Sequence, residues 1–305
     1  MLRGGLESRK LTSVIGCASN ASEMTPATID TSADPTAQIG ALTSAIRAKK
    51  SVLVAFSGGV DSSVVAALAY RALGDQALAV TGVSETLADH ERHEAEIVAE
   101  EIGVPHRTVH YSELADESFS QNPDNRCYFC QNMRMGHLRG LADELGYAVV
   151  ASGTNASDAG EHRPGLRAMD EREVYQPLLE HGVDKTGVRT IARELGLSVW
   201  DKPSMACLAS RIPYGLRVTD ERLSMIERAE AVVQGFGVRQ ARVRHHDGLA
   251  RVEIAPDELG KVLNTDILAE MAEHLKRIGF DFVTLDLEGY RSGRLDETLD
   301  NEETA

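Results

Sequence analysis

The sequence of 305 residues has few cysteines, few basic residues and no long apolar run. Its four cysteines lie in a chain with an intracellular character, which argues against a disulfide framework, and their spacing favours metal binding or redox chemistry. No run of about 18 apolar residues occurs, so we expect no membrane-spanning helix. Lys and Arg number 32 against 47 Asp and Glu, and the net charge of −15 disfavours non-specific binding to a nucleic acid. The sequence therefore predicts a cytoplasmic protein whose partners include neither a membrane nor a nucleic acid.

The two ends of the sequence differ from its interior. Residues 1–37 mix Ser, Thr, Ala and Asp without the apolar core of a signal peptide, and they predict a disordered tail. Residues 295–305 are acidic and predict a second, frayed tail. The interior is long enough for two domains at roughly 100 to 200 residues each, and the change in pattern places them at residues 38–213 and 214–294.

The first of these domains alternates strand and helix patterns, which is typical of an α/β fold with a doubly wound parallel sheet. Expected strands cover residues 52–56, 77–83, 107–111 and 148–152, and expected helices cover residues 39–49, 64–73, 90–102, 130–145 and 186–195. Ligands of such sheets bind at the carboxyl ends of the strands. We therefore expect the site where residues 57–63, residues 153–155 and the segment after Val199 follow their strands.

The second domain has a different pattern. A helix is expected over residues 220–233, a hairpin over 240–246 and 249–255 around Asp247-Gly248, a largely helical stretch over 257–278 and a strand over 280–287. This order predicts a smaller α+β domain with an antiparallel sheet.

The most informative segment joins the first strand to the next helix and reads Ser57-Gly58-Gly59-Val60-Asp61-Ser62-Ser63. Its glycines allow a tight turn, and the helix after them offers free N–H groups and a positive dipole end to a phosphate. Asp61 would repel that phosphate, which suggests a bridging Mg²⁺. The Walker spacing is not met. A plain strand-to-helix turn is the alternative, but the segment resembles the SGGxDS loop of the PP-loop ATPases, enzymes that use ATP and release pyrophosphate.

Three cysteines are expected at the same edge of the sheet. Cys127 and Cys130 open a helix, and Cys207 follows in the loop after the last expected strand. Two thiols at this spacing chelate a metal centre or exchange as a dithiol, and three thiolates hold a 4Fe-4S cluster with one iron left open. The alternative is that these cysteines are small buried hydrophobic residues.

Four segments together resemble the pyridinium-3,5-biscarboxylic acid mononucleotide sulfurtransferase (LarE) family of the PP-loop, or adenine nucleotide alpha hydrolase-like, superfamily. They are the glycine loop, residues 122–130, residues 152–155 and, above all, residues 202–204 with 207–215. The resemblance implies that residues 38–213 form a PP-loop ATP-pyrophosphatase domain and residues 214–294 a substrate-binding or assembly domain.

The resemblance also implies a reaction and a cysteine chemistry. ATP adenylates a carboxylate of the mononucleotide, and sulfur displaces AMP to give a thiocarboxylate on the route to the nickel-pincer nucleotide cofactor. Cys207 matches a cysteine that is sacrificed to dehydroalanine in some members, whereas members with an additional C-x-x-C pair are associated with a 4Fe-4S cluster. With Cys127, Cys130 and Cys207 all present, the cluster is favoured over sacrifice.

ATP and the mononucleotide are expected to use different residues. ATP and its Mg²⁺ are assigned to Ser57, Gly58, Gly59, Asp61, Ser62 and Ser63, with adenine over residues 79–83 ending at Val83 and with Gly153 and Thr154 near the ribose and phosphate. Arg242 and Arg244 share one face of a strand, and the resemblance assigns them, with Arg211 and Arg291, to the anionic mononucleotide. A solvated strand face is the alternative for Arg242, Arg244 and Arg291.

The expected assembly is a homo-oligomer, with a carboxylase and a nickel-insertion enzyme of the same pathway as partners. Three other functions stay open from the sequence: a tRNA-thiolation enzyme, which the net charge fits poorly; an ammonia-using amide synthetase, which has little use for the cysteines; and a nucleotide-sensing module without catalysis.

Overall fold

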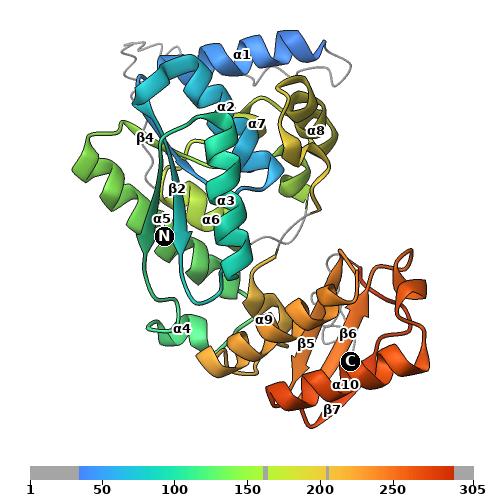
Figure 1. Ribbon diagram of the computed structural model, residues 1–305. Helices are drawn as coiled ribbons and strands as arrows, with labels where there is room; N and C mark the ends of the chain where they lie inside the picture. Colours follow the sequence, from blue (N-terminus) through green and yellow to red (C-terminus); the bar gives the residue numbers. More distant parts are fainter. Residues whose placement is uncertain (1–33, 161–163, 204–205, 292–305) are drawn as a thin grey trace, which may run out of the picture.

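A computed structural model describes residues 34–160, 164–203 and 206–291 and shows two sheets in separate parts of the chain (Figure 1). The first sheet is parallel in the order β3-β2-β1-β4. Its strands are β1 (Val52–Ala55), β2 (Ala77–Val83), β3 (His106–His110) and β4 (Val149–Ala151). The predicted parallel sheet is confirmed.

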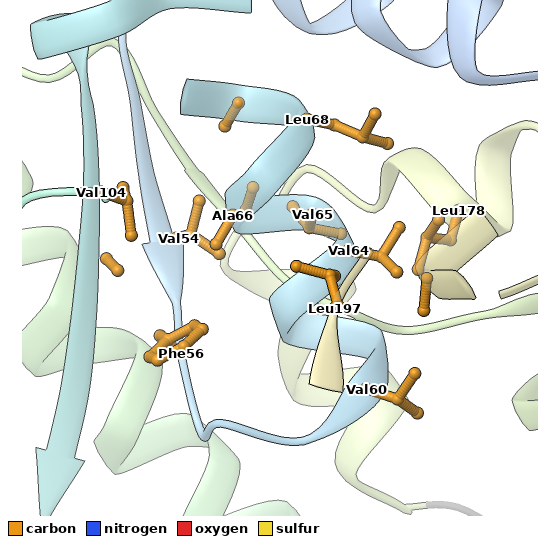
Figure 2. Packing of buried hydrophobic residues seen from close by; sticks show 14 of the residues in the cluster. Val54, Phe56, Val60, Val64, Val65, Ala66, Leu68, Val104, Leu178 and Leu197 are labelled. Atoms are coloured by element: carbon orange, nitrogen blue, oxygen red, sulfur yellow. The ribbon is translucent and has the colours of Figure 1, made fainter. Parts of the chain in front are cut away.

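Helices cover both faces of this sheet. Successive side chains of a strand point to opposite faces, and in β1 the side chains on both faces are apolar and need cover. Val52 and Val54 of β1 belong to one apolar cluster, which Figure 2 shows in part, and Leu53 between them belongs to another. The first cluster includes residues of α1 (Pro35–Ala48), α2 (Val60–Leu73), α3 (Asp89–Ile102) and α8 (Lys185–Glu194), and the second includes residues of α5 (Arg126–Leu145) and α6 (Pro164–Glu171). Buried on both faces, β1 holds the loop that follows it in a fixed place.

The predicted helices of this part and the four strands predicted at residues 52–56, 77–83, 107–111 and 148–152 are present, with shifted ends. α5 begins at Arg126, so Cys127 and Cys130 both lie in its first two turns, and α1 begins at Pro35 behind the capping side chain of Asp34. Two short helices were not predicted, α4 (Glu117–Ser120) and α7 (Pro177–Glu180). The first 33 residues and residues 292–305 lie outside the described part of the chain, and both predicted tails fall largely there.

One expected strand is wrong. The segment that ends near Val199 forms a 3-10 helix over Ser198–Asp201, so the loop of Cys207 does not follow a strand. Tyr175 instead forms the bridge to the edge strand β4. The Cys207 loop still reaches the carboxyl edge of the sheet, because the Leu208 N–H donates to the carbonyl of Thr86, just after β2 (2.9 Å).

The C-terminal part contains α9 (Asp220–Gly235), β5 (Ala241–His246), β6 (Leu249–Ile254), α10 (Thr265–Ile278) and β7 (Phe282–Leu285). The predicted hairpin is confirmed, with Asp247 and Gly248 at φ 47° and 95° in its turn. The prediction of an antiparallel sheet is wrong for β7, which pairs with β6 in parallel. α10 carries the chain back along the sheet between these strands, and such a crossover joins parallel neighbours.

In the described part of the chain, no helix is both long and apolar enough to cross a membrane.

Candidate active site

A cavity of about 600 Å³ opens at the carboxyl ends of β1, β2 and β4. The glycine loop lines it through Ser57, Gly59, Asp61 and Ser62, as do Gly153 and Thr154 after β4. Cys127, Ala206 and Cys207 line it as well. The glycine loop and two of the three cysteines therefore share one cavity.

The glycine loop is held by its own serines. The Ser62 hydroxyl donates to the Gly59 carbonyl (3.1 Å) and accepts from the Ser57 N–H (3.2 Å), while the Ser57 hydroxyl accepts from the Gly59 N–H (3.3 Å). Gly58 has φ +67°. An added Cβ there would lie 2.7 Å from the Ala95 backbone of α3, so only glycine allows this approach. Ser63 is fully buried and does not line the cavity.

Asp61 has two side-chain partners from other segments of the chain. Lys185 at the start of α8 donates to one carboxylate oxygen (2.5 Å), and the Asn155 amide donates to the other (3.1 Å). The carboxylate and the ammonium are each partly exposed, at 25% and 33%. A carboxylate and a lysine at a phosphate site suit a divalent cation and the phosphate oxygens that it binds.

Lys202 is a second lysine at the glycine loop. Its ammonium donates to the Gly58 carbonyl (3.2 Å) and pairs with Glu94 of α3 (2.8 Å). Sequence reasoning assigned no role to Lys185, because only its place after the capping Asp184 marks it and an isolated lysine at a helix start is usually solvated. Lys202 lay in the motif used for the resemblance, but its contact with residue 58 depends on the fold.

The cavity wall on β2 presents Val80, Thr81 and Gly82 rather than Val83. The Ala79 N–H and the Val83 carbonyl form hydrogen bonds on the β3 side of the strand. Because alternate residues of a parallel strand bond to opposite neighbours, the N–H and C=O of Gly82 point toward β1, which ends at Ala55. A backbone donor and acceptor on one residue match the edge of an adenine ring. An added Cβ at Gly82 would lie 3.0 Å from the Tyr111 ring. The assignment of Val83 stays a prediction, and Gly82 is the neighbour that the geometry favours.

Cys127 and Cys207 line the cavity, and Cys130 does not. Cys127 is exposed, Cys207 is partly buried, and Cys130 is buried among Leu208, Ala209 and other apolar residues. Burial raises the pKa of the Cys130 thiol well above its usual range, although the Arg134 guanidinium, 3.6 Å from Sγ, opposes this. Within residues 34–160, 164–203 and 206–291, no three His, Cys, Asp or Glu side chains form a group that could hold a metal ion.

Arg211 braces the loop that carries Cys207. Its guanidinium donates to the carbonyls of Ala206 and Cys207, and it forms a two-pronged ion pair with Glu230 of α9 (2.9 Å for both bonds). The two side chains are only 2% and 5% exposed. Glu230 also accepts from the N–H of Val243 in β5 (3.0 Å). The backbone at Cys207 is thus tied to the C-terminal sheet.

Two further buried arginines bind the same loop. Arg126 donates to the Ala209 carbonyl (3.1 Å), and Arg244 donates to the Ser210 carbonyl (2.7 Å) and pairs with Glu253 (2.9 Å). Because they already contact the loop, Arg211 and Arg244 have clear structural roles. Neither of them lines the cavity.

The other two predicted substrate arginines lie away from the cavity wall as well. Arg242 is buried, its guanidinium lies 5.3 Å from the centre of the Tyr290 ring, and burial lowers its pKa. Arg291 is half exposed and pairs with Glu288 (3.0 Å). Binding of the mononucleotide by all four arginines stays a prediction.

Comparisons with known proteins agree with this geometry. A family model described as asparagine synthase matches residues 39–123, which include the glycine loop. An uncharacterised protein of Synechocystis sp. is 43% identical over 81% of this chain and 92% of its own length. The pyridinium-3,5-bisthiocarboxylic acid mononucleotide synthase of Lactiplantibacillus plantarum is 35% identical over 85% of this chain and 93% of its own length. The chain belongs to this LarE family. The predicted family is confirmed, and with it an ATP-using sulfurtransferase of the PP-loop type.

Relatives outside the LarE family match a shorter part. The tRNA-specific 2-thiouridylase MnmA of Caulobacter sp. (strain K31) is 31% identical over 50% of this chain and 46% of its own length. A match to half of each chain supports a shared PP-loop domain.

Gly153 supplies a test of the cavity beside the glycine loop. A Cβ on residue 153 would lie 2.6 Å from the Ser62 nitrogen and 2.8 Å from the Asp61 carbonyl carbon, both backbone atoms at the start of α2. We expect Gly153→Ala to weaken ATP binding by about tenfold or more, since one lost charge-assisted hydrogen bond costs about 1.5–3 kcal/mol. Gly140→Ala in α5, where an added Cβ meets nothing within 4 Å, is the control. Equal ATP affinity of the two variants in calorimetry would contradict this packing.

Proposed function

We propose that this enzyme uses ATP to adenylate a carboxylate of pyridinium-3,5-biscarboxylic acid mononucleotide and replaces the activated oxygen with sulfur. The observation that carries the proposal is that Cys207 and the glycine loop line one cavity. The relative from Lactiplantibacillus plantarum, whose name describes the bisthiocarboxylic acid product, supports the substrate. A homo-oligomer, with a carboxylase and a nickel-insertion enzyme as pathway partners, belongs to the same proposal.

In the first step, a carboxylate oxygen of the substrate attacks the α-phosphorus of ATP. The bond from that phosphorus to the bridging oxygen breaks, and pyrophosphate leaves with the electron pair. Ser57, Ser62 and the N–H groups at the start of α2 would bind the leaving pyrophosphate. Lys185 and Lys202 add positive charge there, and Asp61 would hold Mg²⁺, which would supply further charge neutralisation.

In the second step, a sulfur nucleophile attacks the acyl carbon and AMP leaves. Cys207 lines the same cavity as the glycine loop, within which that carbon would lie. Cys127 and Cys207 line the cavity and Cys130 is buried beside the Cys207 loop, and the three side chains, brought together as thiolates, would suit a 4Fe-4S cluster. Such a cluster would supply a transferable sulfide.

The alternative source of sulfur is Cys207 itself. After its thiolate has displaced AMP, loss of the α-proton of residue 207 breaks the bond between Cβ and Sγ. The sulfur stays on the product as a thiocarboxylate, and dehydroalanine remains in the chain. This route needs neither Cys127 nor Cys130.

The reaction is tested by incubating the enzyme with ATP, Mg²⁺ and the biscarboxylic acid mononucleotide. We expect pyrophosphate release that depends on the mononucleotide, and a product whose mass increases by the difference between sulfur and oxygen. Pyrophosphate release stimulated instead by tRNA, or by ammonia with an amide as product, would favour one of the two rival PP-loop activities.

The source of sulfur is tested on anaerobically reconstituted protein. We expect about four irons per chain, loss of iron when any one of the three cysteines becomes Ser, and several turnovers with added sulfide. Intact-mass analysis should leave residue 207 unchanged. A single turnover, with a loss of about one H₂S from Cys207 in wild type and in Cys127→Ser alike, would show sacrifice of the cysteine.

A further inference from the structure

Glu91 is a buried carboxylate on the cavity wall that the steps above do not use. It lies in the first turn of α3, is 8% exposed and lines the cavity. Across the described segments of the chain, no hydrogen bond or ion pair reaches its side chain. Burial raises the pKa of this carboxyl group. Leaving a carboxylate without a partner in such a place is costly, which points to a ligand that supplies the partner.

The place of Glu91 in the cavity follows from α3. Residues 91 and 95 share one face of the helix because they are four apart, and Ala95 packs against Gly58 of the glycine loop. Glu91 therefore lies about one helical turn, roughly 5.4 Å, from that contact. On the other side, Thr86 leads into α3 and accepts from the N–H of Leu208, next to Cys207. Glu91 thus lies between the glycine loop and the Cys207 loop.

Several cations surround Glu91 without pairing with it. Arg211, Arg242 and Lys202 all lower its pKa from a distance. Arg211 is bound to Glu230, and Lys202 is bound to Glu94. Positively charged surroundings suit the phosphate and carboxylates of an anionic substrate. The Glu91 carboxylate repels the same phosphate and carboxylates. Glu91 is therefore useful only if part of the ligand is positively charged.

We propose that Glu91 is the counter-ion of the pyridinium ring and selects a substrate whose ring carries a positive charge. This inference rests on the proposed function, in which the adenylated carboxyl group bonds to that ring. With this group between the glycine loop and Cys207, the ring lies beside Glu91. A quaternary ring nitrogen has no N–H, so the contact is an ion pair, which a glutamine cannot replace.

The test compares two mononucleotides that differ in ring charge: the pyridinium-3,5-biscarboxylic acid form and its borohydride-reduced 1,4-dihydropyridine form. Both carry the same phosphate and carboxylates. We expect wild type to bind the pyridinium form at least about tenfold more tightly, the loss typical of one removed charge partner. In Glu91→Gln this ratio should fall to about one through weaker binding of the pyridinium form, with an unchanged Kd for ATP. Glu100→Gln, an exposed glutamate of the same helix, should keep the wild-type ratio.

Other outcomes overturn the inference in distinct ways. If Glu91→Gln keeps the wild-type ratio of affinities for the two mononucleotides, Glu91 forms no ion pair with the ring. If Glu91→Gln binds both mononucleotides equally more weakly, Glu91 has a packing role. A raised Mg²⁺ requirement with an unchanged ratio assigns it to a cation site. If wild type binds ATP but neither mononucleotide, the proposed function fails and the role of Glu91 fails with it.

Discussion

Arg211→Ala is expected to lower the free energy of unfolding by about 3–5 kcal/mol and to abolish sulfur transfer. The substitution leaves Glu230 buried without its partner and frees the carbonyls of Ala206 and Cys207. Urea unfolding measures the first effect, and product formation measures the second. Arg211 ties the loop that carries Cys207 to the C-terminal sheet. In Arg211→Ala this loop should be less ordered, and Cys207 should therefore be alkylated faster than in wild type.

Two comparison variants make this experiment specific. Arg217→Ala removes an arginine whose partner Glu117 is exposed, and it should leave stability nearly unchanged. The double variant Arg211→Ala/Glu230→Gln should recover part of the lost stability, because the unpaired charge is gone, without recovering activity. If Arg211→Ala unfolds at the wild-type urea concentration and only weakens mononucleotide binding, Arg211 is a substrate ligand rather than a brace.

Asp61→Asn is expected to slow pyrophosphate release by about 10²–10³-fold, the usual loss when one group that stabilises the transition state is removed. The amide keeps the contact with Asn155 possible but loses the charge that faces Lys185 and Mg²⁺. Folding should be intact, since this side chain is 25% exposed. A coupled pyrophosphate assay at saturating ATP and Mg²⁺ measures the effect.

Asp75→Asn is the control, because Asp75 is an exposed aspartate just after α2. It should keep wild-type turnover. Near-normal turnover of Asp61→Asn would remove Asp61 from the reaction and leave Lys185 as the main charged group at the loop.

Two failures of prediction in the fold have one physical cause. The stretch around Val199 has the apolar residues of a strand, and residues 280–287 were expected to pair antiparallel. Local pattern shows that a residue is apolar, but not which neighbour it meets. Val199 packs into the cluster beneath α8 as part of a 3-10 helix, and β7 pairs in parallel because α10 returns the chain along β6.

The candidate site residues that could be predicted are those whose chemistry depends on neighbours close in the sequence. The glycine loop was found because its chemistry lies in seven consecutive residues, and the cysteine pair because its spacing is local. Lys185 meets Asp61 across 124 positions, and Arg244 meets the Ser210 carbonyl across 34. No local pattern distinguishes such partners from solvated charges, so Arg242 and Arg244 could be assigned to one strand face but their burial could not be foreseen.

By itself, the sequence determined the parallel α/β class, the glycine loop at a helix start, the family and the three cysteines, because each depends on residues close together in the chain. Tertiary structure alone decided which side chains face the cavity. It turned Gly82 rather than Val83 to the wall, tied Arg211 to Glu230, and left Glu91 buried without a partner among the residues that the structure describes. The physical reason is that burial and pairing depend on which distant segments pack together, and they set the energy of every charge at the site.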